Sequence, residues 1–168
     1  MPACRGFLVL LFSWWEDRLF ESKPYNDSAD YCTIGYGHLI DHDKCENITV
    51  PEKFKNGITK AEAKVLFAKD LKRFETAVKQ EISVKLYQYE YDALVSLLFN
   101  SGSKFLSTGG AGKGDTKIKT NINNEDYEAG AEEFRDVTKS KGAVQPGLVT
   151  RRKQEINMFK NGVYDSTH

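Results

Sequence analysis

Three carboxylates and a hydroxyl near the start of the chain have the types and spacing needed to hydrolyse a glycosidic bond. Glu16, Glu21 and Asp27 precede a short β-like run, residues 31–40, that contains Thr33 and two glycines. The glycines allow the backbone to turn sharply or to approach a ligand closely. One carboxyl group can protonate a leaving oxygen while another, with a hydroxyl beside it, activates a water molecule. This set of residues therefore predicts a glycoside hydrolase.

Five sequence motifs have counterparts, in the same order, in a known protein family. They are PYNDS at 24–28, TIGYGH at 33–38, NGIT at 56–59, YDALVSLLFNSG at 91–102 and GLVTRR at 147–152. With these motifs the chain resembles the phage-type lysozymes. The resemblance implies a two-lobed lysozyme fold and an endolysin-type activity, the inverting hydrolysis of the β-1,4 bond between N-acetylmuramic acid and N-acetylglucosamine in bacterial peptidoglycan. A catalytically impaired lysozyme-like protein that only binds peptidoglycan is the alternative.

The resemblance assigns the water-activating residues more directly than the acid. Asp27 and Thr33 lie six positions apart, as in the family. The general acid of the family precedes the aspartate by nine positions, but here that position is Arg18, whereas Glu16 lies eleven and Glu21 six positions upstream. Glu16 follows two tryptophans at the end of an apolar helix, where burial would raise its pKa and keep it protonated. We therefore expect Glu16 to be the acid, with Glu21 as the alternative.

Two of these residues also have ordinary explanations. Asp27 stands in the tripeptide N-D-S, which is typical of a turn. Glu16 would pair with a lysine or arginine if it were only a charged residue at a helix end. For Asp27, the family motif favours the catalytic interpretation.

The resemblance also implies supporting residues in other parts of the chain. His38 is expected to be structural and to pair with Asp70 in the long helix, because a histidine with a carboxylate partner is commonly a satisfied ion pair. Arg151 and Arg152 match the paired arginines of the family, one of which can reach the catalytic glutamate. An arginine there would orient that carboxylate and lower its pKa, in opposition to burial.

Three residues are expected to contact the substrate. Phe99 and Asn100 match the region of the helical lobe that faces the cleft, and Thr116 is expected near a sugar subsite. For Phe99, a place in the hydrophobic core is an equally good interpretation.

Two interpretations with a bound metal or phosphate are weaker. His38, His42 and Cys45 lie at spacings that suit zinc, but no second cluster of ligands accompanies them. The run GGAGKGDT at 109–116 resembles part of a phosphate loop, but the position where such a loop requires its first glycine is Ser107, and Gly114 replaces the serine or threonine after Lys113. We expect neither a metal nor a cofactor.

Charge and hydropathy limit the partners. Lys and Arg total 24 and Asp and Glu total 24, so no net field attracts nucleic acid or anionic lipid. The apolar stretch at 6–15 is too short to span a bilayer and lacks a signal cleavage site. We expect a monomer that binds peptidoglycan, binds no nucleic acid and has no stable membrane insertion. It would stay in the host bacterial cytoplasm until it is released to the periplasm and cell wall, with an exported or membrane-tethered form as the alternative.

The cysteine count bears on the redox state. Cys4, Cys32 and Cys45 cannot all pair within one chain. The odd number favours free thiols in a reducing compartment, and a bridge between Cys32 and Cys45 is the alternative.

Hydrophobic patterning predicts an α+β fold, and the resemblance implies that residues 1–168 form one lysozyme-like domain. A small β-hairpin lobe at about 17–58 is followed by a linking helix at 59–82 and a larger all-helical lobe at 83–168, packed with the N-terminal helix. Thr59 and Glu62 form a predicted capping box at the start of the linking helix. Further helices are expected near 91–99, 125–137 and 150–159, with Gly162 as a stop, and loops at 52–57 and 107–116.

Overall fold

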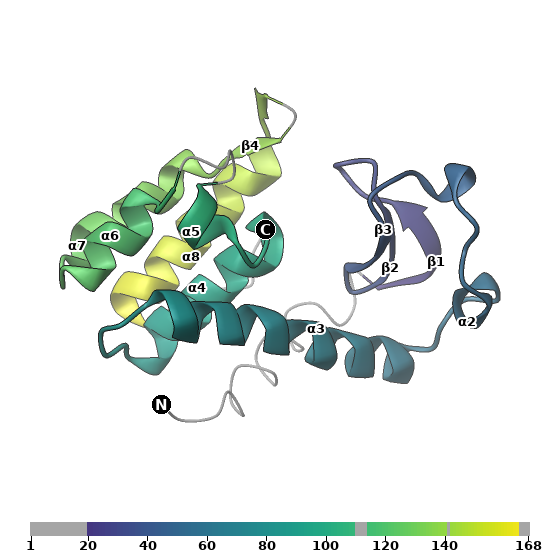
Figure 1. Cartoon of the computed structure of the whole chain (residues 1–168), viewed down its shortest axis with the longest axis horizontal. Helices are drawn as coiled ribbons and strands as arrows, with labels where there is room; N and C mark the ends of the chain where they lie inside the picture. Colours follow the sequence, from purple (N-terminus) through teal and green to yellow (C-terminus); the bar gives the residue numbers. More distant parts are fainter. Residues whose placement is uncertain (1–19, 110–113, 141, 165–168) are drawn as a thin grey trace. The chain divides into compact units, whose positions relative to one another are not determined.

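The computed structural model describes residues 20–109, 114–140 and 142–164 of the chain (Figure 1). Its contacts divide these residues into two compact units, one that ends at Asp70 and one that begins at Leu71. The predicted N-terminal helix, Glu16 and Cys4 lie outside the described residues. The first unit carries a small sheet and the second is mainly helical, which confirms the α+β class. Within the described ranges, no helix is both long and apolar enough to cross a bilayer.

The first unit is organised by a three-stranded antiparallel sheet in the order β1-β2-β3. Its strands are β1 (Glu21–Asn26), β2 (Cys32–Gly35) and β3 (His38–Asp41). Gly35 and Gly37 have φ angles of +69° and +85°, so they supply the left-handed backbone that the tight turn between β2 and β3 requires. The middle strand β2 is buried along its whole length, which places Thr33 in the interior.

A 3-10 turn, η1 (Cys45–Asn47), and a one-turn helix, α2 (Glu52–Lys55), follow the sheet. The prediction of a loop at 52–57 is therefore wrong for α2. Pro51 precedes this helix with φ of −53°, a value already suited to helical backbone, and Phe54 is buried. The φ angle of Pro51 and the burial of Phe54 are enough to form a single helical turn. One turn is too short to leave a periodic hydrophobic pattern in the sequence.

A disulfide joins β2 to η1 through Cys32 and Cys45, whose Cα atoms are 4.7 Å apart. The expectation of free thiols is wrong for this pair. Two hydrogen bonds hold the segment after β3 against strands β1 and β2. The Cys32 N–H donates to the Asp43 carbonyl (2.8 Å), and the Cys45 N–H donates to Asn26 Oδ1 (2.8 Å). The pairing depends on this path of the chain, which the count of cysteines does not reveal.

Helix α3 (Lys60–Glu81) begins in the first unit and ends in the second. Its predicted capping box is confirmed, because the Thr59 N–H donates to Glu62 Oε2 (2.7 Å) and the Glu62 N–H donates to Thr59 Oγ1 (3.2 Å). These bonds satisfy backbone groups that have no partner within the helix. The helix begins and ends within one residue of the predicted 59–82.

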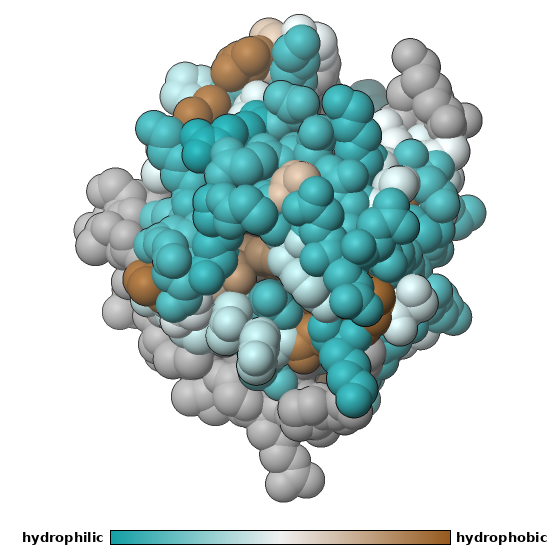
Figure 2. All heavy atoms as spheres, turned by 90° about the vertical axis from the view of Figure 1, so that its left-hand side faces the viewer, coloured by the Kyte–Doolittle hydropathy of each residue, from teal (hydrophilic) through white to brown (hydrophobic). Residues whose placement is uncertain are grey.

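The second unit is built around α4 (Gln88–Ser101), which packs mainly on α8 (Pro146–Asn161). Leu94, Leu97 and Leu98 of α4 are fully buried. The remaining elements are α5 (Phe105–Thr108), α6 (Lys117–Asn123), α7 (Tyr127–Glu132), the 3-10 turn η2 (Glu133–Asp136) and the hairpin of β4 (Lys139–Ser140) and β5 (Ala143–Val144). Figure 2 shows a mainly hydrophilic face on which hydrophobic residues form only small, separate groups.

Several boundaries in this unit differ from the sequence prediction. The single helix expected at 125–137 is divided into α7 and η2, and α8 starts at Pro146, four residues before the predicted start. The loop expected at 107–116 contains the end of α5, and Thr116 already caps α6. Gly162 ends α8 with φ of +66°, as predicted, because a left-handed residue at this position closes the helix.

Candidate active site

Asp27 follows β1 directly and its carboxylate is held by the backbone of its own turn. Asp27 Oδ1 accepts hydrogen bonds from the N–H groups of Ala29 (2.8 Å) and Tyr31 (2.9 Å). The Asp27 N–H donates to the Tyr31 carbonyl at 3.0 Å. This is the turn that N-D-S predicts, and it gives the carboxylate a fixed direction while Oδ1 alone carries these bonds.

Thr33 lies on β2 close to this turn. It is 3% exposed, pairs with Tyr25 on β1 and Leu39 on β3, and donates from Oγ1 to the Tyr31 carbonyl (3.1 Å). Asp27 is the first residue after β1 and lies two positions beyond Tyr25. The two candidate side chains, Asp27 and Thr33, both bind the peptide groups of one residue, Tyr31.

The negative charge of Asp27 affects the pKa of Tyr25 on β1. Burial raises the pKa of Tyr25, and the negative charges of Asp27 and Glu21 raise it further. A phenol beside two carboxylates thus stays neutral and can serve as a hydrogen-bond donor on this side of the hairpin.

Of the two candidate acids, the structure describes only Glu21. It is the first residue of β1, lies opposite Gly35, and is exposed. Its side chain therefore lacks the buried environment that the sequence predicts for the general acid. Glu16 falls outside the described residues, and its assignment as the acid stays a prediction.

His38 and Asp70 form a close pair between β3 and α3. His38 Nδ1 lies 2.7 Å from Asp70 Oδ2, and the two side chains are 21% and 23% exposed. The imidazole also packs edge-on against the ring of Phe54, with the centroids 5.6 Å apart. His38 is thus occupied on both sides, and Cys45 is in a disulfide, so two of the three residues considered for zinc are engaged in other contacts.

In the second unit, a buried polar cluster connects α4 with α8. Glu155 is 3% exposed, and its Oε1 accepts from Ser96 Oγ (2.6 Å) and from Arg151 Nε (3.0 Å). Arg151 also donates from Nη2 to the Ser96 carbonyl (3.2 Å). Sequence reasoning missed Ser96 and Glu155, although a glutamate three and four residues after two arginines on one helix is a signal for such pairing.

Arg152 occupies the inner side of this cluster. It is 1% exposed, its Nη2 donates to Asn100 Oδ1 (2.8 Å), and its Nε lies 3.0 Å from Glu155 Oε2. Burial lowers the pKa of Arg152 to about 10, in spite of the attraction of Glu155. The predicted arginines and Asn100 are thus brought together on α4 and α8.

The other two predicted substrate residues have mainly structural contacts. Phe99 is half-buried, with its ring edge-on to Phe74 at 5.4 Å between centroids. Thr116 caps α6, because its Oγ1 donates to the Leu106 carbonyl and accepts from the Lys119 N–H, both at 3.2 Å. Thr116 also lines an open hollow of about 370 Å³.

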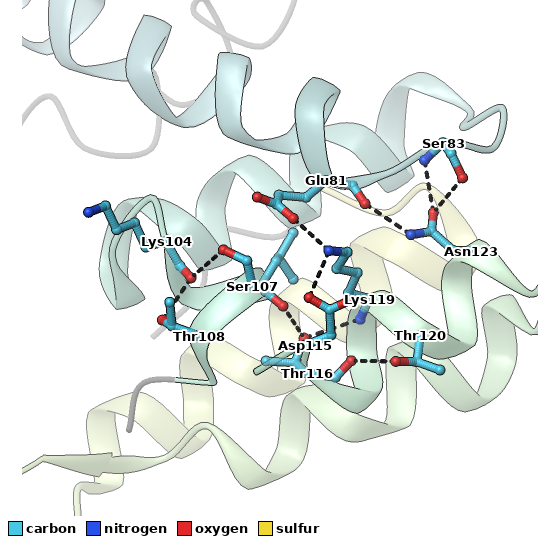
Figure 3. Close-up of polar contacts among 11 residues, drawn as sticks. Glu81, Ser83, Lys104, Ser107, Thr108, Asp115, Thr116, Lys119, Thr120 and Asn123 are labelled. Atoms are coloured by element: carbon cyan, nitrogen blue, oxygen red, sulfur yellow. Dashed lines mark hydrogen bonds and ion pairs between the residues drawn. The ribbon is translucent and has the colours of Figure 1, made fainter. Parts of the chain in front are cut away.

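A second polar cluster, also missed from sequence, fastens α6 to the end of α3 (Figure 3). Lys119 Nζ lies 2.8 Å from both Glu81 Oε2 and Asp115 Oδ1, and these bonds raise the pKa of Lys119. Asn123 donates to the Glu81 carbonyl (2.9 Å) and accepts from the Ser83 N–H (2.8 Å). The cluster therefore adds polar contacts to the packing of α6, whose Ile118 and Ile122 are buried.

Comparison with known proteins identifies close similarity along most of the chain. The model of the family described as Phage lysozyme matches residues 18–155. The endolysin of Bacillus phage B103 is 34% identical over 92% of this chain, and the chain spans about half, 52%, of that relative. The endolysin of Salmonella phage P22 is 33% identical over 82% of this chain and 85% of its own length.

A solved structure shares the fold. The endolysin from Escherichia coli O157:H7 phage FAHEc1 superimposes with a TM-score of 0.74 at 28% identity, covering 98% of this chain and 97% of that protein.

Proposed function

Because this chain belongs to the phage lysozyme family, we propose that it is an endolysin-type muramidase. The reaction is hydrolysis of the β-1,4 bond between N-acetylmuramic acid and N-acetylglucosamine in bacterial peptidoglycan, with inversion at the anomeric carbon. The observation that carries the proposal is the shared attachment of Asp27 and Thr33 to the backbone of Tyr31.

In this mechanism Glu16 is the general acid and protonates the glycosidic oxygen. Asp27, with its carboxylate direction set by two N–H donors, accepts a proton from a water molecule on the opposite face of the sugar ring. Thr33 helps to position that water. Inversion requires room for the water, so the two carboxyl groups should stand about 6.5–9.5 Å apart in the active protein.

Other parts of the chain support this site. His38 and Asp70 connect β3 to α3 and would keep the hairpin in place. Phe99, Asn100 and Thr116 would contact the glycan. No cofactor takes part in this mechanism, which needs only carboxyl groups and water.

We also infer where and in what form the protein works. It would remain in the host bacterial cytoplasm until it is released to the periplasm and the cell wall, and act there as a monomer. The two units would fold as one domain, because the continuous helix α3 belongs to both. Analytical ultracentrifugation and a single unfolding transition followed by both sheet and helix signals would test these two statements.

The test of the activity is the clearing of permeabilised Gram-negative cells by the purified protein and by three variants. Asp27→Asn should reduce the rate by about 10²–10⁴-fold, the usual contribution of a general base, with an unchanged circular dichroism spectrum. Glu16→Gln should be similarly inactive, whereas the matched control Glu21→Gln should clear cells like the parent.

If only Glu21→Gln loses activity, Glu21 and not Glu16 is the general acid. A folded parent protein that binds peptidoglycan but clears no cells would instead support the binding-only alternative. Nuclear magnetic resonance of the first product formed would show the α-anomer if the reaction inverts.

A further inference from the structure

Stability alone does not explain the buried guanidinium of Arg152. Its Nε and Nη1 groups are buried without a hydrogen-bond partner, and its approach to Glu155 is close but not aligned as a hydrogen bond. Unsatisfied buried N–H groups cost free energy, and apolar replacement of a buried ion pair is often neutral or stabilising. A buried arginine with such a cost is a candidate for a functional role.

The one aligned hydrogen bond of Arg152 fixes the orientation of Asn100. A guanidinium carries only donors, so the amide atom that meets Nη2 at 2.8 Å must be the carbonyl oxygen Oδ1. The amide nitrogen Nδ2 is then the polar atom on the other side of the side chain.

Asn100 presents this nitrogen at the surface. The residue is exposed at the end of α4, and no acceptor among residues 20–109, 114–140 and 142–164 binds Nδ2. The surface therefore offers two N–H donors whose direction is set from inside the protein. A site of this kind selects an acceptor oxygen and discriminates against a donor.

We propose that Arg152 is a positioning residue that holds Asn100 with its amide N–H groups toward the substrate, where they bind a carbonyl or carboxylate oxygen. The inference rests on the proposed function and adds the chemical role of Asn100, which is a donor. Peptidoglycan carries such oxygens in the acetamido groups of its sugars and in the carboxylates of its peptides.

Asn100→Asp tests this role, because aspartate keeps an oxygen for Arg152 but replaces the outward N–H groups by an acceptor. We measure the affinity for isolated sacculi by co-sedimentation in an Asp27→Asn background, which suppresses hydrolysis. The affinity should fall about ten-fold, the effect of one lost hydrogen bond. The urea midpoint should stay the same or rise, because a carboxylate binds Arg152 more strongly than an amide.

The control is Asn161→Asp, which adds the same charge at the exposed end of α8 and should leave the affinity unchanged. An unchanged affinity in Asn100→Asp, or an equal loss in Asn161→Asp, would overturn the proposal. Arg152→Met should weaken binding by the folded protein like Asn100→Asp, and its urea midpoint should fall because buried Glu155 loses one of its two arginine partners. A lower midpoint with unchanged affinity of the folded protein would make Arg152 a structural residue.

Two further measurements separate the possible causes. If Asn100→Asp weakens binding equally to sacculi stripped of peptides by an amidase, the oxygen belongs to the sugar; if it weakens binding only to intact sacculi, the oxygen belongs to the peptide. Hydrolysis by the parent protein is measured in parallel. An inactive parent whose Asn100→Asp variant still loses affinity would contradict the proposed catalysis and leave this inference standing.

Discussion

The disulfide between Cys32 and Cys45 should contribute strongly to stability. The two cysteines are 13 positions apart in the sequence. The entropy lost by closing a loop of this length in the unfolded chain corresponds to about 3 kcal/mol at 25 °C. With a urea dependence of about 2 kcal/mol per molar, reduction should lower the midpoint of unfolding by about 1.5 M.

The measurement compares oxidised and reduced protein in a Cys4→Ser background, which removes the third thiol as a partner for exchange. Reduction leaves both side chains in place, so the difference reports the cross-link without a change in packing. The variant Cys32→Ala/Cys45→Ala then adds the separate loss of packing at Cys32, which is fully buried. If the urea midpoints of the oxidised and reduced protein agree within about 0.3 M, the claim that the disulfide stabilises the fold by restricting the unfolded chain is refuted.

Three further predictions concern the core, a turn and a helix start. Leu98→Ala in the fully buried face of α4 should cost about 2–5 kcal/mol of unfolding free energy in urea titrations, whereas a loss below about 1 kcal/mol would mean that the core closes around the cavity. Gly57→Ala should cost about 1–3 kcal/mol in the same assay, because φ is +84° and a Cβ would lie 2.6 Å from the Ser22 carbonyl oxygen; a neutral result would disprove the clash. Burial raises the pKa of Glu90, although the hydrogen bond from the Tyr87 N–H opposes this shift. Above pH 4.5 the native state therefore binds more protons than the unfolded state. The free energy of unfolding then falls as the pH rises through the folded-state pKa of Glu90. Glu90→Gln, which keeps the acceptor, should therefore be more stable than the parent at pH 7 and lose this advantage below pH 4.5, and a difference independent of pH would count against the burial argument.

The sequence contains clear local signals for the hairpin and for α3. The two glycines around Tyr36 mark a turn because their positive φ is a property of the residue type, and Thr59 with Glu62 marks a helix start because the two bonds are local. Such features need no knowledge of the rest of the chain. The turn at Asp27 belongs to the same class, since its bonds span at most four residues.

Features that depend on distant partners were missed. Helix α6 has only seven residues and two buried isoleucines, and Lys119 and Asn123 hold it through contacts about 40 positions away. Glu155 looks like an exposed residue of a charged helix, yet it is buried against Ser96, 59 positions earlier. Pattern and propensity carry no information about such pairs, because the pairing is decided by the packing of α4 on α8.

The backbone of Tyr31, and not its side chain, binds Asp27 and Thr33. The identity of residue 31 is therefore free to vary among functional sequences, with proline excluded because it has no N–H to donate to Asp27. A search for related proteins gains more from fixing the spacing of Asp27 and Thr33 than from matching this tyrosine. Its ring, 38% exposed and edge-on to His42, is also a convenient point to attach a spectroscopic label beside the turn.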